Sequence, residues 1–458
     1  MTTIGNIRLE KFPPVTGTQP TQVTGKSRMS LAKLLFDDKW YRWFLYGMVL
    51  LGGISFLLMF YLLWLGAFRG LLPVDVPMPG RDFSPHYHAA IAFSRGEGIS
   101  PYAVGFLYFP LVIFYYLPLS HLSFYPAFFV VTLWNLLMAL VTATLATKIL
   151  AHYQVRLPAA GKWLIFLGII FFCPVTASLN SGNVNTLAAC FITMFYYFLC
   201  VKEKNLYAGL SLVVATLFKI FPAFLLLLAI VKRRFKFILA FLLILALCCV
   251  TSISLLGVPA HVDFAKWLLI TNQSTAKAWG CNSAISSIIY NSLEFFNIQG
   301  TVQNIINITW VFIRLAFVLS ISGYLYLLFR RRGEASRDNQ WSILSFSLFS
   351  VLMVSLPNQA WVYYTSCLVL PFILCIFCLE LSPLEKTLLA LSVGFFSFNT
   401  HIDTICTLIG GVFPSLVYLV HPSVIGNLLF LAFVSLKMVR LKRGSESAQI
   451  EESLRLHL

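Results

Sequence analysis

Residues 202–236 read KEKNLYAGLSLVVATLFKIFPAFLLLLAIVKRRFK. The run 206–231 within this stretch is almost wholly apolar, and a basic cluster stands at each of its ends. About 20 apolar residues are enough to cross the hydrocarbon core of a membrane, and Lys and Arg collect on the cytoplasmic side. We therefore expect this run to lie in a membrane with both of its ends cytoplasmic.

The middle of the run contains Lys219-Ile220-Phe221-Pro222. Lysine is expensive inside a bilayer, and proline removes a backbone hydrogen bond and breaks a helix. The pattern predicts two short helices that meet near Lys219 and form a hairpin. A single span, with the following basic cluster outside, is the alternative.

The whole chain has a similar composition. Of its 458 residues, 59% are hydrophobic and 11% are charged, whereas a soluble domain carries about 25% charged residues. The net charge of +16 comes from Lys and Arg at the ends of apolar runs, which orients a membrane protein and gives no indication of nucleic-acid binding. We expect an all-α polytopic membrane protein.

Further apolar runs lie on both sides of the quoted stretch. Together with the two arms of the hairpin they predict about 12 transmembrane helices, with both termini cytoplasmic. The other predicted spans are 45–68, 126–150, 163–179, 186–200, 235–257, 305–329, 343–356, 363–379, 387–399 and 414–436.

One transmembrane domain, 42–440, should lie between two cytoplasmic tails. The tails are residues 1–41, which are polar and contain several Pro, Thr and Gly, and residues 441–458. The predicted outer loops are about 69–124 and 258–303.

The first outer loop contains the apolar stretch 106–121. It is bounded by Pro110 and Pro118 and is too short to cross a membrane comfortably. We expect interfacial helices on the outer surface there.

Asp82 is the strongest candidate for a catalytic group. It precedes a helix predicted at 84–95, beside Arg81, and His86 and Tyr87 follow within this helix. A carboxylate in this position can act as a general base that takes a proton from an attacking hydroxyl. The alternative is a carboxylate that only caps the helix.

Lys219 is the second candidate, because its charge could neutralise a lipid phosphate; a lysine that only reaches toward the membrane surface is the alternative. Tyr102, Trp267 and Trp279 could stack on sugar rings or belong to an interfacial aromatic belt. Asp82 and its neighbouring histidines lack a third carboxylate at metal-binding spacing, so we expect no metal. No phosphate-binding glycine motif is present, and we expect no cofactor.

Several short motifs follow one another between residues 80 and 285. They are Arg81-Asp82-Phe83, His86-Tyr87-His88-Ala89-Ala90, Gly98, Pro101-Tyr102, Phe106-Leu107-Tyr108-Phe109-Pro110, Trp134-Asn135, Gly182-Asn183-Val184-Asn185, Lys219-Ile220-Phe221-Pro222 and Asn282-Ser283. In this order they resemble glycosyltransferase family 87, whose members are multispanning enzymes with the type C glycosyltransferase fold.

The resemblance is looser toward the C-terminus. Where the family has Ser-Pro-x-x-Trp-x-His, with the histidine implicated in activity, residues 355–363 read SLPNQAWVY. Tyr363 stands in place of the histidine, Asn183 in place of a glutamine and Phe109 in place of a proline. A family member that binds a lipid-linked sugar without turnover is therefore an alternative.

The resemblance implies a glycosyltransferase that moves a sugar, here expected to be mannose, from a polyprenyl-phosphate carrier to a lipid or glycan acceptor with inversion. It implies that Asp82 is the catalytic base. We expect Lys219 to bind the donor phosphate, with Arg81 and Lys277 as further candidates. The expected substrate contacts are His86, Tyr87, Tyr102, Asn183, Asn185, Trp279, Asn282, Trp361 and Tyr363.

The bacterial type of this family implies an inner membrane and an active site that faces the periplasm. The expected partners are the lipid-linked donor, the acceptor and membrane lipids, without nucleic acid. A transporter or flippase of lipid-linked sugars is the alternative class. Such proteins carry broken helices in matching positions of two halves, and only the break at Lys219 is visible in the sequence.

Overall fold

A computed structural model describes residues 80–100, 105–271, 282–298, 300–331, 339–357, 360–408 and 421–457, with a few positions between 46 and 57. In this part of the chain the secondary structure is helical, and no strand occurs beyond an isolated bridge between Asn282 and Trp361. The all-α class is therefore confirmed for the described residues. The predicted first span, 45–68, lies almost wholly outside them.

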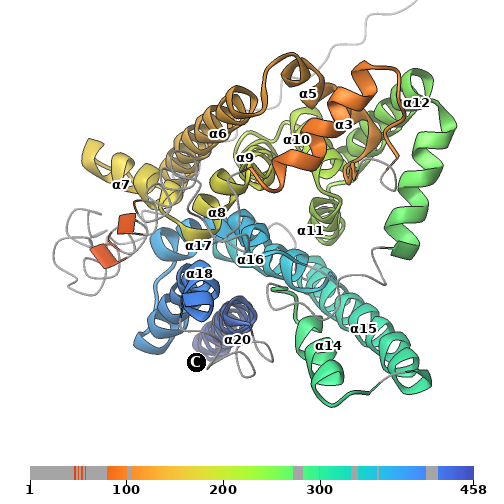
Figure 1. Ribbon diagram of the computed structural model, residues 1–458. Coiled ribbons are helices and arrows are strands. Elements are labelled where there is room, and N and C mark those ends of the chain that lie inside the picture. The colour runs from red at the N-terminus through yellow and green to blue at the C-terminus, as the bar shows by residue number, and fades with distance from the viewer. Residues whose placement is uncertain are drawn as a thin grey trace, which may run out of the picture.

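Long and short helices alternate along the chain (Figure 1). Their bounds are α3 (Phe83–Ser94), η1 (Pro110–Val112), α5 (Ile113–Tyr116), η2 (Leu117–His121), α6 (Phe124–His152), α7 (Ala159–Ile170), α8 (Cys173–Ser181), α9 (Asn185–Tyr196), η3 (Tyr197–Val201), α10 (Asn205–Phe218), η4 (Phe221–Leu225), α11 (Leu226–Val231), α12 (Phe235–Lys266), η5 (Trp267–Thr271), α14 (Ser286–Phe295), α15 (Thr301–Arg331), α16 (Asn339–Ser355), η7 (Val362–Leu368), α17 (Val369–Cys378), α18 (Pro383–Leu408) and α20 (Pro422–His457).

Four of the described helices are long and apolar enough to cross a membrane. They are α6, α12, α15 and α20, and each coincides with a predicted span. A fifth span exists if α7 and α8, which are bent by 57° relative to each other, cross together. The total of about 12 transmembrane helices remains a prediction.

The predicted break at Lys219 is present. Helix α10 ends at Phe218, and Lys219 is extended with φ −148° and ψ 125°. Pro222 follows, and a proline ring clashes with the carbonyl four residues before it, which here belongs to Phe218. The chain becomes helical again in η4 and α11. The return of the second arm as a hairpin remains a prediction.

Both predicted outer loops contain helices. Residues 110–121 form three short pieces, η1, α5 and η2, and no continuous span. After Gly257 the chain differs from the expected polar loop. Helix α12 bends there, with φ 78° and ψ 164°, and continues to Lys266. His261 stabilises this bend, since its ring nitrogens lie 2.8 Å from the Gly257 carbonyl oxygen and 2.8 Å from Ser252 Oγ. At the C-terminus the predicted tail 441–458 is also helical, because α20 continues to His457.

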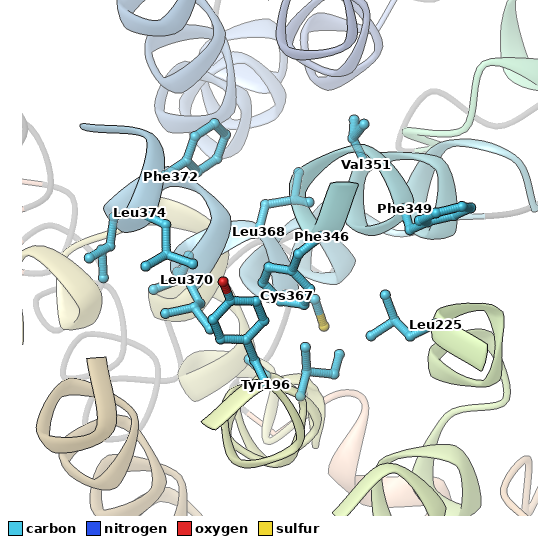
Figure 2. Packing of buried hydrophobic residues seen from close by; sticks show 14 of the residues in the cluster. Tyr196, Leu225, Phe346, Phe349, Val351, Cys367, Leu368, Leu370, Phe372 and Leu374 are labelled. Carbon is cyan, nitrogen blue, oxygen red and sulfur yellow. The ribbon is translucent and has the colours of Figure 1, made fainter. Parts of the chain in front are cut away.

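Helix α16 forms the centre of the molecule. Every residue from Trp341 to Ser355 is buried, and the serines among them let neighbouring helices approach closely. Figure 2 shows Phe346 and Phe349 of α16 packed among Tyr196, Leu225 and residues of η7 and α17. This packing brings α8, α9, α16 and η7 together, and the candidate site lies where these helices begin or end.

Candidate active site

Two segments that are far apart in the sequence pair at the start of α3. The Gly80 backbone N–H donates to the Asn180 carbonyl at 2.9 Å, and the Asp82 N–H donates to the Ser181 carbonyl at 3.1 Å. The predicted first outer loop is thereby joined to the turn between α8 and α9. The segment between the predicted spans 163–179 and 186–200 thus forms a turn that lies against Asp82.

Gly182 makes this approach possible. It ends α8 in the left-handed region at φ 68°, a conformation in which a Cβ atom is unfavourable. A Cβ added there would lie 2.7 Å from Cβ of Phe83 and 3.0 Å from the Phe128 ring. Only glycine therefore lets the turn lie this close to Asp82.

Asp82 occupies the position before the first residue of α3, but its side chain makes no capping hydrogen bond. Instead, Oδ2 accepts a hydrogen bond of 3.0 Å from Nδ2 of Asn183. The side chain is half-buried. The capping alternative thus does not describe this residue, whose carboxylate points toward the turn.

Asn183 is held in one orientation by its neighbours. Its Oδ1 accepts hydrogen bonds from the backbone N–H of Asn185 at 3.2 Å and from the Asn185 side-chain amide. Its backbone carbonyl accepts from Ser178 Oγ at 2.9 Å and from Asn135 Nδ2 at 3.1 Å. Since its amide oxygen is already engaged, Asn183 presents its NH₂ group to the Asp82 carboxylate.

Lys219 lies between two aromatic rings. Its Nζ is 4.9 Å from the centre of the Tyr108 ring and 5.1 Å from that of Tyr364, distances at which a cation is attracted to the ring face. The charges of Lys219 and Asp82 interact, yet no ion pair joins these two described residues. The Lys219 ammonium and the Asp82 carboxylate thus lie near enough for their charges to interact, but they are not in direct contact.

Tyr363 also lies at this site. Its hydroxyl lies near the Asp82 carboxylate, and the two groups interact electrostatically. Its ring stacks on that of Trp361 at a centroid distance of 6.0 Å and a tilt of 13°. The residue that replaces the histidine of the family pattern therefore faces Asp82.

Asn282 holds the segment that carries Trp361. Its Oδ1 accepts hydrogen bonds from the backbone N–H of Ala360 at 2.9 Å and of Ala284 at 3.1 Å. It also forms the isolated bridge with Trp361. We conclude that Asn282 shapes the site through the backbone on which Trp361 and Tyr363 stand.

His86 and Tyr87 are buried beneath the site. The His86 ring stacks on Tyr108 at a centroid distance of 4.0 Å. Burial lowers the pKa of His86 to about 3, with a further contribution from the charge of Lys219, so the imidazole is neutral at physiological pH. The Tyr87 hydroxyl donates to the Leu122 carbonyl at 2.6 Å. Both residues hold the first outer loop together.

Of the remaining expected substrate and donor-phosphate contacts, the structure describes one. Arg81 is solvent-exposed. Tyr102, Lys277 and Trp279 lie outside the described residues. Among the residues whose positions are described, no group of three His, Cys, Asp or Glu side chains is placed to hold a metal ion.

Three residues of interest were not predicted. Tyr108 and Tyr364 flank Lys219, and no feature of sequence spacing indicates that they meet there. Arg314, by contrast, gives a plain signal, because it is a charged residue inside the predicted span 305–329. The same reasoning that identified Lys219 applies to it.

Comparison with known families gives one match. The model of glycosyltransferase family 87 matches residues 106–357, more than half of the chain. The matched region contains Asn183, Lys219 and Asn282, whereas Asp82 and Tyr363 lie just outside it. A search of curated proteins finds no match.

Proposed function

Because the chain belongs to glycosyltransferase family 87, and is therefore a membrane glycosyltransferase, we propose that it transfers mannose from a polyprenyl-phosphate carrier to a hydroxyl of a lipid or glycan. The observation that carries this proposal is the placement of Asp82 near Lys219 without an ion pair between them. The reaction needs a base for the incoming hydroxyl and a positive charge for the departing phosphate.

In the proposed reaction the Asp82 carboxylate takes the proton of the acceptor hydroxyl. The hydroxyl oxygen forms a bond to the anomeric carbon, and the bond from that carbon to the phosphate oxygen breaks. The phosphate leaves with the bonding electrons on the opposite face, so the configuration inverts. Lys219 stabilises the charge that develops on the phosphate.

Asn183 and Tyr363 position the base. The Asn183 amide donates to Oδ2 of Asp82, and its own orientation is fixed by Asn185. The Tyr363 hydroxyl approaches the same carboxylate from η7. The hydrogen bond from Asn183 restrains the base while the substrate binds, which favours proton transfer over short distances.

Several short helices end at the site. The apolar segments Asn185–Val201, Asn205–Phe218 and Val362–Cys378 have 10–17 residues, fewer than the roughly 20 needed to cross a bilayer. We infer that the site is recessed within the thickness of the membrane. A donor with a lipid carrier reaches such a site more readily than a soluble nucleotide sugar.

The charge pattern supports an orientation with both termini cytoplasmic. The basic clusters at Lys202, Lys232–Lys236 and Lys437–Arg443 would then lie inside, and Asp82 would face the outside. We propose a bacterial-type inner membrane with the site open to the periplasm.

The test is transfer of radiolabelled mannose from polyprenyl-phosphate mannose to endogenous lipid or glycan, in membranes that contain equal amounts of each variant. We expect Asp82→Asn to lose about 100-fold or more of the transfer, since removal of a general base has effects of this order. Glu97→Gln, an exposed carboxyl shortly after α3, is the matched control and should retain wild-type transfer.

Two outcomes would contradict the proposal. Wild-type transfer by Asp82→Asn would remove Asp82 as the base. Absence of transfer by the wild-type protein would refute the mannosyl donor. Movement of the intact lipid-linked sugar between leaflets, without transfer, would instead support a transporter.

A further inference from the structure

Helix α15 carries one charged residue inside an apolar span. The membrane-capable part of the helix is Asn304–Leu327, and Arg314 stands near its middle. Only 6% of the most apolar window is buried inside the protein, so most of this helix faces lipid. An ionised group at such a depth is expensive and calls for a specific partner.

Within the part of the chain that the structure describes, no carboxylate supplies that partner. Arg314 Nη1 donates to the Leu356 carbonyl at 2.6 Å, and the guanidinium lies 5.7 Å from the centre of the Trp310 ring. Among the described carboxylates, none forms an ion pair with Arg314. The charge of Arg314 also interacts with Tyr290. A guanidinium has five N–H donors, and within the described residues the Leu356 carbonyl is the acceptor that Arg314 contacts.

An unused donor lies one turn away. Trp310 and Arg314 are four residues apart and share a face of α15. The Trp310 Nε1–H is buried and has no acceptor. Buried donors in proteins almost always have partners. A cation and an unsatisfied neutral donor on one face point to an anion with several oxygen atoms.

Arg314 is also linked to the candidate active site. Leu356, whose carbonyl it binds, directly follows α16. From there the chain continues through Ala360 and Trp361 to Tyr363, beside Asp82. An anion bound at Arg314 would therefore lie next to the segment that forms one side of the site.

We propose that Arg314 and Trp310 bind the phosphate of a membrane lipid that enters the site from the bilayer. A phosphate offers several acceptor oxygens and suits the planar guanidinium, which can bind it through two N–H groups. Trp310 and Arg314 lie at the edge where the otherwise uncovered helix α15 meets the end of α16, which favours a lipid over a soluble anion. Both a polyprenyl-phosphate donor and a phospholipid acceptor carry a phosphate. The proposal that this lipid is a substrate rests on the proposed function, whereas the binding of a lipid phosphate does not.

The test is direct binding to purified protein, measured by native mass spectrometry. Undecaprenyl phosphate and phosphatidylinositol are the two probes. We expect Arg314→Gln to bind one of them about tenfold or more weakly, the size of a lost charge-assisted hydrogen bond. Arg314→Lys keeps the charge and should retain most of the binding. Lys148→Gln, an exposed cation on α6, is the matched control.

Arg314→Gln retains N–H groups for the Leu356 carbonyl, and its unfolding temperature without added lipid reports whether the fold is intact. Loss of undecaprenyl phosphate binding identifies the donor, and loss of phosphatidylinositol binding identifies the acceptor. Unchanged binding of both lipids by a folded Arg314→Gln would refute the proposal, as would a wild-type protein that binds neither. Lipid binding is measured without turnover, so failure of this proposal and failure of the transfer reaction are distinguishable.

Discussion

The neutral state of His86 has a consequence for stability. Its ordinary pKa is about 6.5, and burial together with Lys219 lowers the pKa in the folded protein to about 3. Between pH 7 and pH 5 the unfolded chain therefore takes up a proton that the folded protein does not. Folding is weakened as the pH falls through this window, by about 2 kcal/mol from this residue.

We expect His86→Phe to reduce this dependence, because phenylalanine fills the same space against Tyr108 and does not titrate. The measurement is the unfolding temperature in detergent at several values between pH 5 and pH 7. His88→Phe, on the exposed side of the same helix, should leave the slope unchanged. Equal slopes for wild type and His86→Phe would show that His86 is not the titrating group.

Individual residues also show how much of the candidate site could be predicted from the sequence. Asp82 and Lys219 were predicted because an unusual charge in an apolar or loop context is a local signal. Their proximity is a long-range property that spacing does not encode. The aromatic rings of Tyr108 and Tyr364 around Lys219 belong to segments more than 250 residues apart, and their meeting appears only in the folded chain.

At the scale of elements, the junction of α3 with the end of α8 depends on Gly182. We expect Gly182→Ala to destabilise the protein by about 1–3 kcal/mol, since it combines a left-handed backbone with a contact of 2.7 Å to Cβ of Phe83. Because Phe83 follows Asp82 directly, transfer should also fall, by about tenfold.

Thermal unfolding and the mannosyl transfer assay together check this prediction. Gly168→Ala is the matched control, because that glycine is helical in α7 and a Cβ there meets nothing within 4 Å. Its effect should be neutral or slightly stabilising. If Gly182→Ala and Gly168→Ala have the same unfolding temperature and transfer activity, the close contact between Gly182 and Phe83 does not require glycine at position 182.

The element boundaries were predictable where proline and glycine act locally. The end of α10 follows from Pro222, and the end of α8 follows from Gly182. The predicted span 235–257 ends at Gly257, whereas the helix bends there and resumes. That outcome depends on contacts of His261 and Phe109 around the bend, which are tertiary and cannot be deduced from the pattern.

At the scale of the whole molecule, α18 and α20 are joined by a buried charge cluster. Glu385 is 1% exposed, and its carboxylate lies 3.2 Å from Arg440 and 3.7 Å from Lys437. It also accepts the Ser382 backbone N–H at 2.8 Å, as in a capping box. We expect Glu385→Gln to destabilise the protein by about 1–3 kcal/mol, because the largely buried Lys437 ammonium loses its carboxylate partner, whereas Arg440 is 45% exposed and is stabilised by water.

The exposed pair Glu203–Arg234 provides the control for this prediction. Its side chains are 67% and 42% exposed, so Glu203→Gln should change stability by less than about 1 kcal/mol. The two variants are compared by thermal unfolding in the same detergent. Similar unfolding temperatures for both would mean that the cluster at Glu385 contributes little to the fold.

The shortness of the helices that end at the site has a consequence for biogenesis. Of the described helices, α6, α12, α15 and α20 are apolar and long enough to pass from the translocon into the membrane independently. The serine-rich α16 and the short α9, α10 and α17 lack that length or apolarity, and partition into lipid only alongside helices already inserted. In nascent chains that are released before α20 is synthesised, these inner segments should therefore be unprotected and accessible to quality-control proteases.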